Sequence, residues 1–271
     1  MAKYTLSTFT QNPIARRISR QSHWPSARLS FWLAFGLGLL TLGVSVWALL
    51  HLPEAYLEWL LIGGWGAVLV GPVLIAPITA LLTRHDLNGD QYQLLYLTSL
   101  SDETLVAGYI WGTLMRLRLL MAVGVGSMPM VTIGTVYLGI RYEAAIEAMS
   151  GFYRPRPEQI IAPTTAEIVW LAIVSIIFVF IALSFSLPSA AIGVVTALHW
   201  KNPILASALA LGWSVFSLAV VAGGFNLVVL LSFGNPYLLG FCQTIFLLIC
   251  IYGLWMPMLL NALKYVRRPI Y

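Results

Sequence analysis

The fold of this chain is decided by an apolar run at residues 59–82, which reads WLLIGGWGAVLVGPVLIAPITALL. The run contains no Asp, Glu, Lys or Arg, and it exceeds the about 20 residues that a helix needs to cross the hydrocarbon of a bilayer. Because a bilayer offers no water, the backbone N–H and C=O groups of such a run must bond to one another, as they do in a helix. The run therefore predicts a transmembrane helix.

Five further runs are also long enough to cross a bilayer and also contain no Asp, Glu, Lys or Arg. They are Phe31–Leu52, Leu119–Leu138, Ile168–Leu187, Ile204–Leu231 and Leu238–Leu263. The whole chain agrees, since 59% of its residues are hydrophobic and 9% are charged, whereas a typical soluble domain has about 25% charged residues. The alternating pattern of a membrane β-barrel is absent from the sequence. We predict an all-α, multi-pass protein of the cell membrane with six transmembrane helices.

The distribution of basic residues predicts the orientation of these six spans. With a cytoplasmic N-terminus, the cytoplasmic segments are 1–30, 83–118, 188–203 and 264–271, and the C-terminus is cytoplasmic too. These segments hold twelve of the 15 basic residues, namely Lys3, Arg16, Arg17, Arg20, Arg28, Arg84, Arg116, Arg118, Lys201, Lys264, Arg267 and Arg268. Such an excess of Lys and Arg is typical of cytoplasmic loops.

The charge and the motif content narrow the classes of function. The formal net charge of +5 is spread over membrane-flanking segments, so we expect membrane lipids as partners and no nucleic acid. A nucleotide-binding G-x-x-x-x-G-K-[ST] loop, an H-E-x-x-H motif and a G-x-S-x-G motif are all absent from the sequence, which predicts that the chain is not an enzyme. We expect no cofactor and no metal, and we interpret Cys242 and Cys250 as buried thiols.

The predicted spans also lack ionisable residues in their cores. Ion-coupled transporters and voltage sensors place such residues at membrane depth, so transport by this chain would need power from outside the bilayer. The glycines and prolines of the spans, such as Gly71, Pro72 and Pro77, leave two readings open. They are typical of close helix packing, and they are also found at hinges in transport cycles.

The polar segment 83–118 between the second and third spans has two parts. Residues 93–100 mix polar and apolar side chains, as a helix lying on the membrane surface does. Ser101, followed by Asp102 and Glu103, is typical of a helix start, and the helix is expected to run from Asp102 through Arg118 into the third span. We interpret Arg116 and Arg118 as headgroup-reaching side chains rather than a buried functional pair.

Three stretches carry a resemblance to a known family. The polar segment follows the pattern R-E-x-E-x-G-T-x-E-x-L-x-x-T-P-L-S-x-x-E-I-x-x-G-K at Arg84, Asp86, Gly89, Leu94, Leu95, Thr98, Leu100, Ser101, Leu105 and Gly108. NPIARRISRQ at Asn12–Gln21 is similar to an interfacial elbow helix, and Leu187–Leu211 is similar to a tight cytoplasmic turn between the fourth and fifth spans. In these features the chain resembles the permeases of ABC-2 type transporters.

The resemblance implies a permease-like bundle, 31–271, preceded by a cytoplasmic segment, 1–30, that contains the interfacial helix. It also implies two partners, a separate ABC ATPase subunit and a second permease subunit in a homo- or heterodimer. The ATPase-coupling residues that it implies are Asp86, Gly89, Gln93, Leu95, Thr98, Leu100, Ser101 and Gly108. We expect a lipophilic or amphiphilic substrate, because the span cores contain no charged pocket.

The chain departs from the family pattern at Gln91, Gln93, Ser99, Thr104 and Tyr109, where the family usually has Thr, Glu, Pro, a second Glu and Lys. Two explanations follow: a divergent partner in a heterodimeric permease, or a permease-derived structural or assembly subunit of another, larger membrane complex. The external segment, 139–167, is compatible with both, as a solvated cap or as a docking surface.

Overall fold

A computed structural model describes residues 12–20, 26–52, 54–88, 101–137 and 165–231, and isolated positions between 242 and 264. Nearly all of these residues are helical, and no strand occurs among them. The helices are α2 (Pro13–Arg20), α3 (Ala27–His51), α4 (Glu54–Asn88), α6 (Asp102–Arg116), α7 (Arg118–Gly126), α9 (Thr165–Ser184), α10 (Ser186–His199) and α11 (Pro203–Leu231). A helical stretch at 128–137 follows α7 across a turn at Ser127.

Five segments of the described residues are long and apolar enough to cross a membrane. They are Ala27–His51, Glu58–Asn88, Arg118–Tyr137, Ile168–His199 and Pro203–Val221. The prediction of an all-α, multi-pass membrane protein is confirmed at this level. Half of the sixth predicted span, Leu238–Leu263, lies outside the described residues, as do most of the external segment and residues 89–100 of the polar segment.

The helices that follow the external segment continue past the predicted end of the fourth span. We expected it to end at Leu187 and to be followed by a cytoplasmic segment, 188–203. Instead, α10 continues the helix to His199, and only Trp200, Lys201 and Asn202 separate it from α11. Run length indicates only the residues that a bilayer requires, whereas packing against α4 keeps α10 helical beyond that length.

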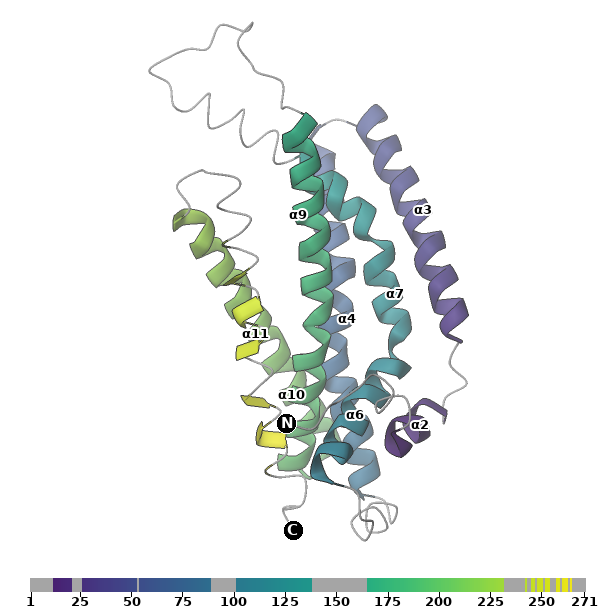
Figure 1. Cartoon of the computed structure of the whole chain (residues 1–271), viewed down its shortest axis with the longest axis vertical. Helices are drawn as coiled ribbons and strands as arrows, with labels where there is room; N and C mark the ends of the chain where they lie inside the picture. The colour runs from purple at the N-terminus through teal and green to yellow at the C-terminus, as the bar shows by residue number, and fades with distance from the viewer. Residues whose placement is uncertain are drawn as a thin grey trace, which may run out of the picture.

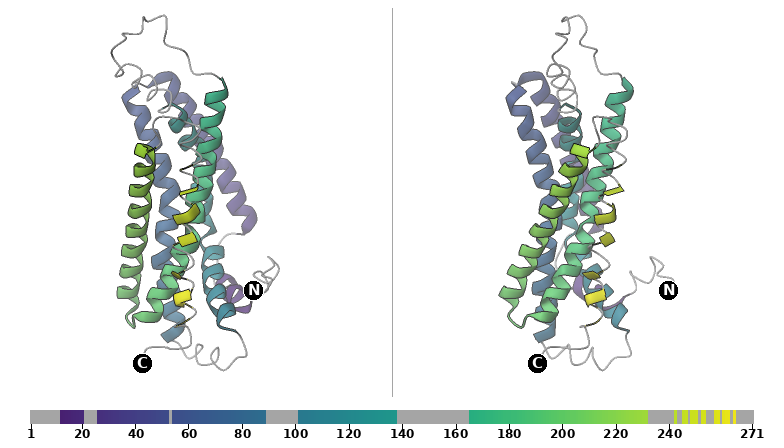
Figure 2. Two further views of the ribbon diagram at one scale, coloured as in Figure 1. Left: turned by 60° about the vertical axis from the view of Figure 1, so that its left-hand side comes forward. Right: turned by 90° about the vertical axis from the view of Figure 1, so that its left-hand side faces the viewer.

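The bundle is organised around α4, which contacts every other labelled helix except α2 (Figures 1 and 2). At 35 residues α4 is about 52 Å long, and it therefore extends beyond a hydrocarbon layer of about 30 Å. On opposite sides of α4, α3 packs against α7, and α11 packs against α4 and α10 (Figure 1). The helices α2, α6 and α10 gather at one end of the bundle, which we call the α2–α6 end.

Small residues bring α10 and α4 into very close contact. A Cβ atom added at Gly193 would overlap the carbonyl oxygen of Ala76 and lie 2.6 Å from Cβ of Thr79. Ala206 and Ala210 of α11 are fully buried in the same region. Backbones that approach this closely gain van der Waals contact, which is the main attraction between helices in a membrane.

Two helix breaks lie side by side within the spans. One is at Ser127, after α7, and the other is at Phe185, between α9 and α10. Two contacts show that they are close together. A Cβ atom at Gly124 would lie 2.6 Å from Cδ2 of Leu183. The Ser186 hydroxyl donates to Sδ of Met121 at 3.1 Å. The regions around the two breaks are therefore in contact.

Candidate functional site at the α2–α6 end

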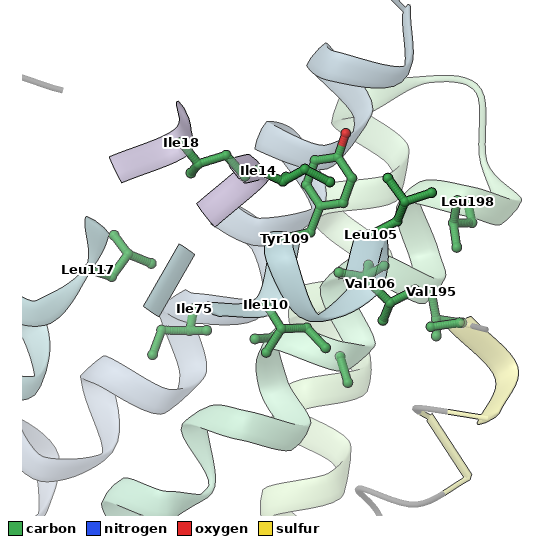
Figure 3. Close-up of a cluster of buried hydrophobic side chains, with 14 residues drawn as sticks. Ile14, Ile18, Ile75, Leu105, Val106, Tyr109, Ile110, Leu117, Val195 and Leu198 are labelled. Atoms are coloured by element: carbon green, nitrogen blue, oxygen red, sulfur yellow. The ribbon is translucent and has the colours of Figure 1, made fainter. Parts of the chain in front are cut away.

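The α6 helix, which the sequence placed in the coupling segment, belongs to the core of the protein (Figure 3). Its buried apolar side chains are Leu105, Val106, Tyr109 and Ile110. They form one cluster with residues of three other helices, including Ile14 and Ile18 of α2, Ile75 of α4, and Val194, Val195 and Leu198 of α10. A force applied to α6 would therefore reach α4 and α10 through side chains already in contact.

The start of α6 is capped as the sequence predicted. The Thr104 N–H donates to Oγ of Ser101 at 3.3 Å, and the hydroxyls of these two residues are hydrogen-bonded at 2.7 Å. Asp102 and Glu103 occupy the first turn, where negative charge suits the helix dipole. The Thr104 hydroxyl thus takes up a local contact at the position where the related pattern has a carboxylate.

We predicted an uninterrupted helix from Asp102 into the third span, and this prediction is wrong because the helix is interrupted at Leu117. There α6 ends and α7 begins, and the Leu117 N–H still donates to the carbonyl oxygen of Thr113 at 2.9 Å. Leu117 is only 2% exposed, whereas the flanking Arg116 and Arg118 remain partly exposed. The turn therefore buries the leucine and keeps both arginines near the surface, and it permits α6 and the span to differ in direction.

The α2 helix packs into a groove on α6 that two glycines create. A Cβ atom at Gly108 would lie 2.7 Å from Cβ of Ile14, and one at Gly112 would lie 2.9 Å from Cβ of Ile18. The glycines are four residues apart, as are the isoleucines, so each pair occupies one helix face. We call this paired arrangement the α2–α6 unit.

Asn12 adds a polar link between the two helices of the α2–α6 unit. Its side-chain oxygen accepts from the N–H groups of Ile14 at 3.0 Å and Ala15 at 3.3 Å, which caps α2. Its amide nitrogen donates to the carbonyl oxygen of Thr104 at 2.8 Å. One buried side chain thus starts α2 and attaches it to the first turn of α6.

A polar hollow of about 390 Å³ opens beside the α2–α6 unit. It is lined by Ile18 of α2, by Leu82, His85 and Asp86 from the last turns of α4, and by Arg116 of α6. We call it the Asp86–Arg116 hollow. Because it presents both signs of charge, it suits contact with a polar protein surface.

Arg84 links α4 to the end of α10. Its Nε donates to the carbonyl oxygen of Lys201 at 2.8 Å, and Nη1 donates to that of Ala197 at 3.4 Å. The last carbonyl groups of a helix have no partner within the helix, and a cation is favourable beside them. Arg84 therefore fixes the turn between α10 and α11, which its place in the sequence motif did not suggest.

The structure describes three of the predicted coupling residues. Asp86 lines the hollow, Ser101 caps α6, and Gly108 is covered by Asn12 and Ile14, so a partner protein could not touch Gly108. Gly89, Gln93, Leu95, Thr98 and Leu100 lie outside the described residues. The sequence reading missed Asn12 and Gly112, although the four-residue spacing of Gly108 and Gly112 was a usable signal.

The described residues contain no group of three or more His, Cys, Asp or Glu side chains that could hold a metal ion. Cys242 and Cys250 are free thiols, and both are partly exposed rather than buried as predicted. Comparisons of the chain with protein-family models, with curated proteins and with solved structures found no match.

Proposed function

We propose that this chain is a permease subunit of an ATP-binding-cassette transporter, similar to the ABC-2 type, and that a separate ATPase chain powers it. The observation that carries the proposal is the α2–α6 unit, a pair of helices at one end of the bundle that shares a buried core with α4 and α10. A second permease subunit, identical or different, completes the transporter.

Motion of the ATPase would be transmitted through the core that α6 shares with α2, α4 and α10. Displacement of α6 by a docked ATPase moves α2 with it, since Ile14 and Ile18 fill the groove at Gly108 and Gly112. The same displacement reaches α4 through Ile75 and α10 through Val194. The breaks at Leu117 and Ser127 provide places where the third span can bend. Nucleotide-driven closure of the ATPase would thereby change the tilt of the spans.

The surface that we assign to the ATPase is the Asp86–Arg116 hollow, together with residues 89–100 of the polar segment, which lie between α4 and α6 in the sequence. With the α2–α6 end facing the cytoplasm, this surface is on the side where ATP is available, in agreement with the positive-inside distribution of Lys and Arg. The substrate is lipophilic or amphiphilic, since the cores of the predicted spans contain no Asp, Glu, Lys or Arg.

A second function has one observation in its favour. Residue 104 is Thr where the ABC-2 pattern has Glu, so this position offers a partner protein no carboxylate. The Thr104 hydroxyl is instead hydrogen-bonded to the hydroxyl of Ser101. A chain that had kept the fold and lost charged coupling contacts would serve as a structural or assembly subunit of a larger membrane complex. The two functions differ in the companion protein, because only the permease requires an ATPase.

The proposal is tested by ATP turnover in the complex isolated in a gentle detergent. We expect Arg116→Glu, which reverses a charge in the hollow, to lower turnover by roughly tenfold, equivalent to about 1.4 kcal/mol of lost coupling. Leu95→Asp and Leu100→Asp are expected to lower it as well. Arg28→Glu makes the same charge change at an exposed position on α3 and should leave turnover unchanged. Normal turnover in all three coupling variants, with folded protein, would contradict the proposal.

A further inference from the structure

A second cavity lies between α10, α11 and the residues near 258–261. Its volume is about 340 Å³, near the lower end of the about 300–1,000 Å³ that ligand pockets span. We call it the Trp200 pocket. Its volume suits one hydrocarbon chain rather than a complete two-chain lipid.

The Trp200 pocket is apolar at one end and polar at the other. Ile192, Trp213 and Met258 line it toward the interior of the bundle, while His199, Trp200 and Asn261 line it near the ends of the helices. Ile192 and His199 are seven residues apart on α10, which corresponds to about 10 Å along the helix axis. The pocket therefore runs lengthwise, from the helix ends toward the middle of the span.

The polar end lies where a membrane–water boundary is expected. Trp200 is 46% exposed and follows the last residue of α10, and tryptophans concentrate at the headgroup level of membranes. The His199 ring is held by contact between Nδ1 and the carbonyl oxygen of Val195 at 2.8 Å. A molecule in the pocket would thus have its hydrocarbon part beside Ile192 and its polar part beside Trp200.

The charge at this end favours an anion. Lys201 is exposed next to Trp200, and the guanidinium group of Arg84 binds the Lys201 carbonyl oxygen at 2.8 Å. None of the described residues that line the pocket is acidic. Basic residues at the membrane surface attract anionic lipid headgroups by about 1 kcal/mol each.

We infer that the Trp200 pocket binds an anionic membrane lipid, with one acyl chain between α10 and α11 and the headgroup beside Trp200 and Lys201. This inference does not depend on the proposed transport function, since a structural subunit can hold a bound lipid too. A lipid at this place would fill the space beside the α10–α11 turn that Arg84 fixes.

The test uses the full-length chain in phosphatidylcholine vesicles that contain a photoreactive lipid. Two probes carry the same diazirine-bearing acyl chain, one on phosphatidylglycerol and one on phosphatidylcholine, and labelled peptides are mapped after irradiation. We expect the phosphatidylglycerol probe to label the peptides of Ile192 and Met258 above the level at Leu40, an exposed residue of α3. Equal labelling at the pocket and at Leu40 would overturn the inference.

Two variants and a matched control sharpen the test. Val195→Phe fills the pocket and should reduce labelling there to the level at Leu40, whereas Val215→Phe, the same change at an exposed position of α11, should not. Lys201→Gln should lower the preference for phosphatidylglycerol by about fivefold, which corresponds to about 1 kcal/mol. If Val195→Phe fails to fold, an unchanged preference in Lys201→Gln would overturn the inference. Equal labelling by both probes would overturn the anionic assignment, and unchanged labelling in folded Val195→Phe would overturn the site.

Discussion

At the scale of single residues, Gly193 allows α10 to approach α4 closely, because it has no side chain. Any side chain there would meet the Ala76 carbonyl oxygen, which belongs to the backbone of a helix and cannot move aside by a rotamer change. We expect Gly193→Ala to lower the free energy of unfolding by about 1–3 kcal/mol, as overpacking usually does. The measurement is the unfolding midpoint in detergent.

The control for this substitution is Gly212→Ala on α11, where an added Cβ atom meets nothing within 4 Å. Since alanine favours a helix over glycine by about 1 kcal/mol in water, this change should be neutral or slightly stabilising. A loss of stability equal to that of Gly193→Ala would mean that the close contact between α10 and α4 does not set the cost.

Arg84 provides a second test at the residue scale. In Arg84→Met the carbonyl oxygens of Ala197 and Lys201 lose a charged donor, which typically costs about 1–3 kcal/mol. We expect a lower unfolding midpoint together with faster protease cleavage at 200–202. Lys201→Met removes an exposed side chain from the same turn and should change stability by less than about 0.5 kcal/mol. Equal effects of the two substitutions would argue against the cap.

At the scale of elements, the attachment of α2 to α6 depends on Asn12. Asn12→Asp keeps the oxygen that caps α2 but replaces the amide that donates to Thr104 with a second oxygen facing that carbonyl. The lost hydrogen bond is worth about 0.5–1.5 kcal/mol, so we expect trypsin cleavage in α2, where Arg16 is exposed, to accelerate by roughly two- to twelvefold.

Asn202→Asp is the matched control for this change. Asn202 caps α11 through the same two contacts, to the N–H groups of Ile204 at 2.9 Å and Leu205 at 3.4 Å, and the aspartate can make both. Cleavage in α2 should stay at the rate of the unmodified chain. If Asn12→Asp also leaves that rate unchanged, the link to Thr104 does not hold α2 in place.

Elements could be predicted from the sequence where a single run determines them. The start of α6 at Ser101 was predictable because its cap is local, and the α3 and α11 runs were predictable because each has a length and composition that only a helix in a membrane satisfies. The break at Leu117 and the extension of α10 to His199 were not predictable. Both depend on neighbouring helices, and apolar run length carries no information about them.

At the scale of the whole molecule, the predicted all-α membrane bundle required only composition and run length, but the candidate site required contacts between distant segments. Asp86 and Arg116 line one hollow because the ends of α4 and α6 lie beside each other. Gly108 is covered because α2 packs against α6. Sequence spacing indicated which residues share a helix face. It could not indicate which other helix occupies that face.

We propose above all that the chain works with a separate ATPase that docks at the α2–α6 end. The most direct measurement is purification of the full-length chain from its own membranes in a gentle detergent, followed by identification and quantification of the proteins that remain bound. We expect a chain with a G-x-x-x-x-G-K-[ST] loop in a fixed ratio to this one, and less of it with Arg116→Glu than with Arg28→Glu. Stoichiometric binding to another membrane complex, with no such ATPase present, would contradict the claim.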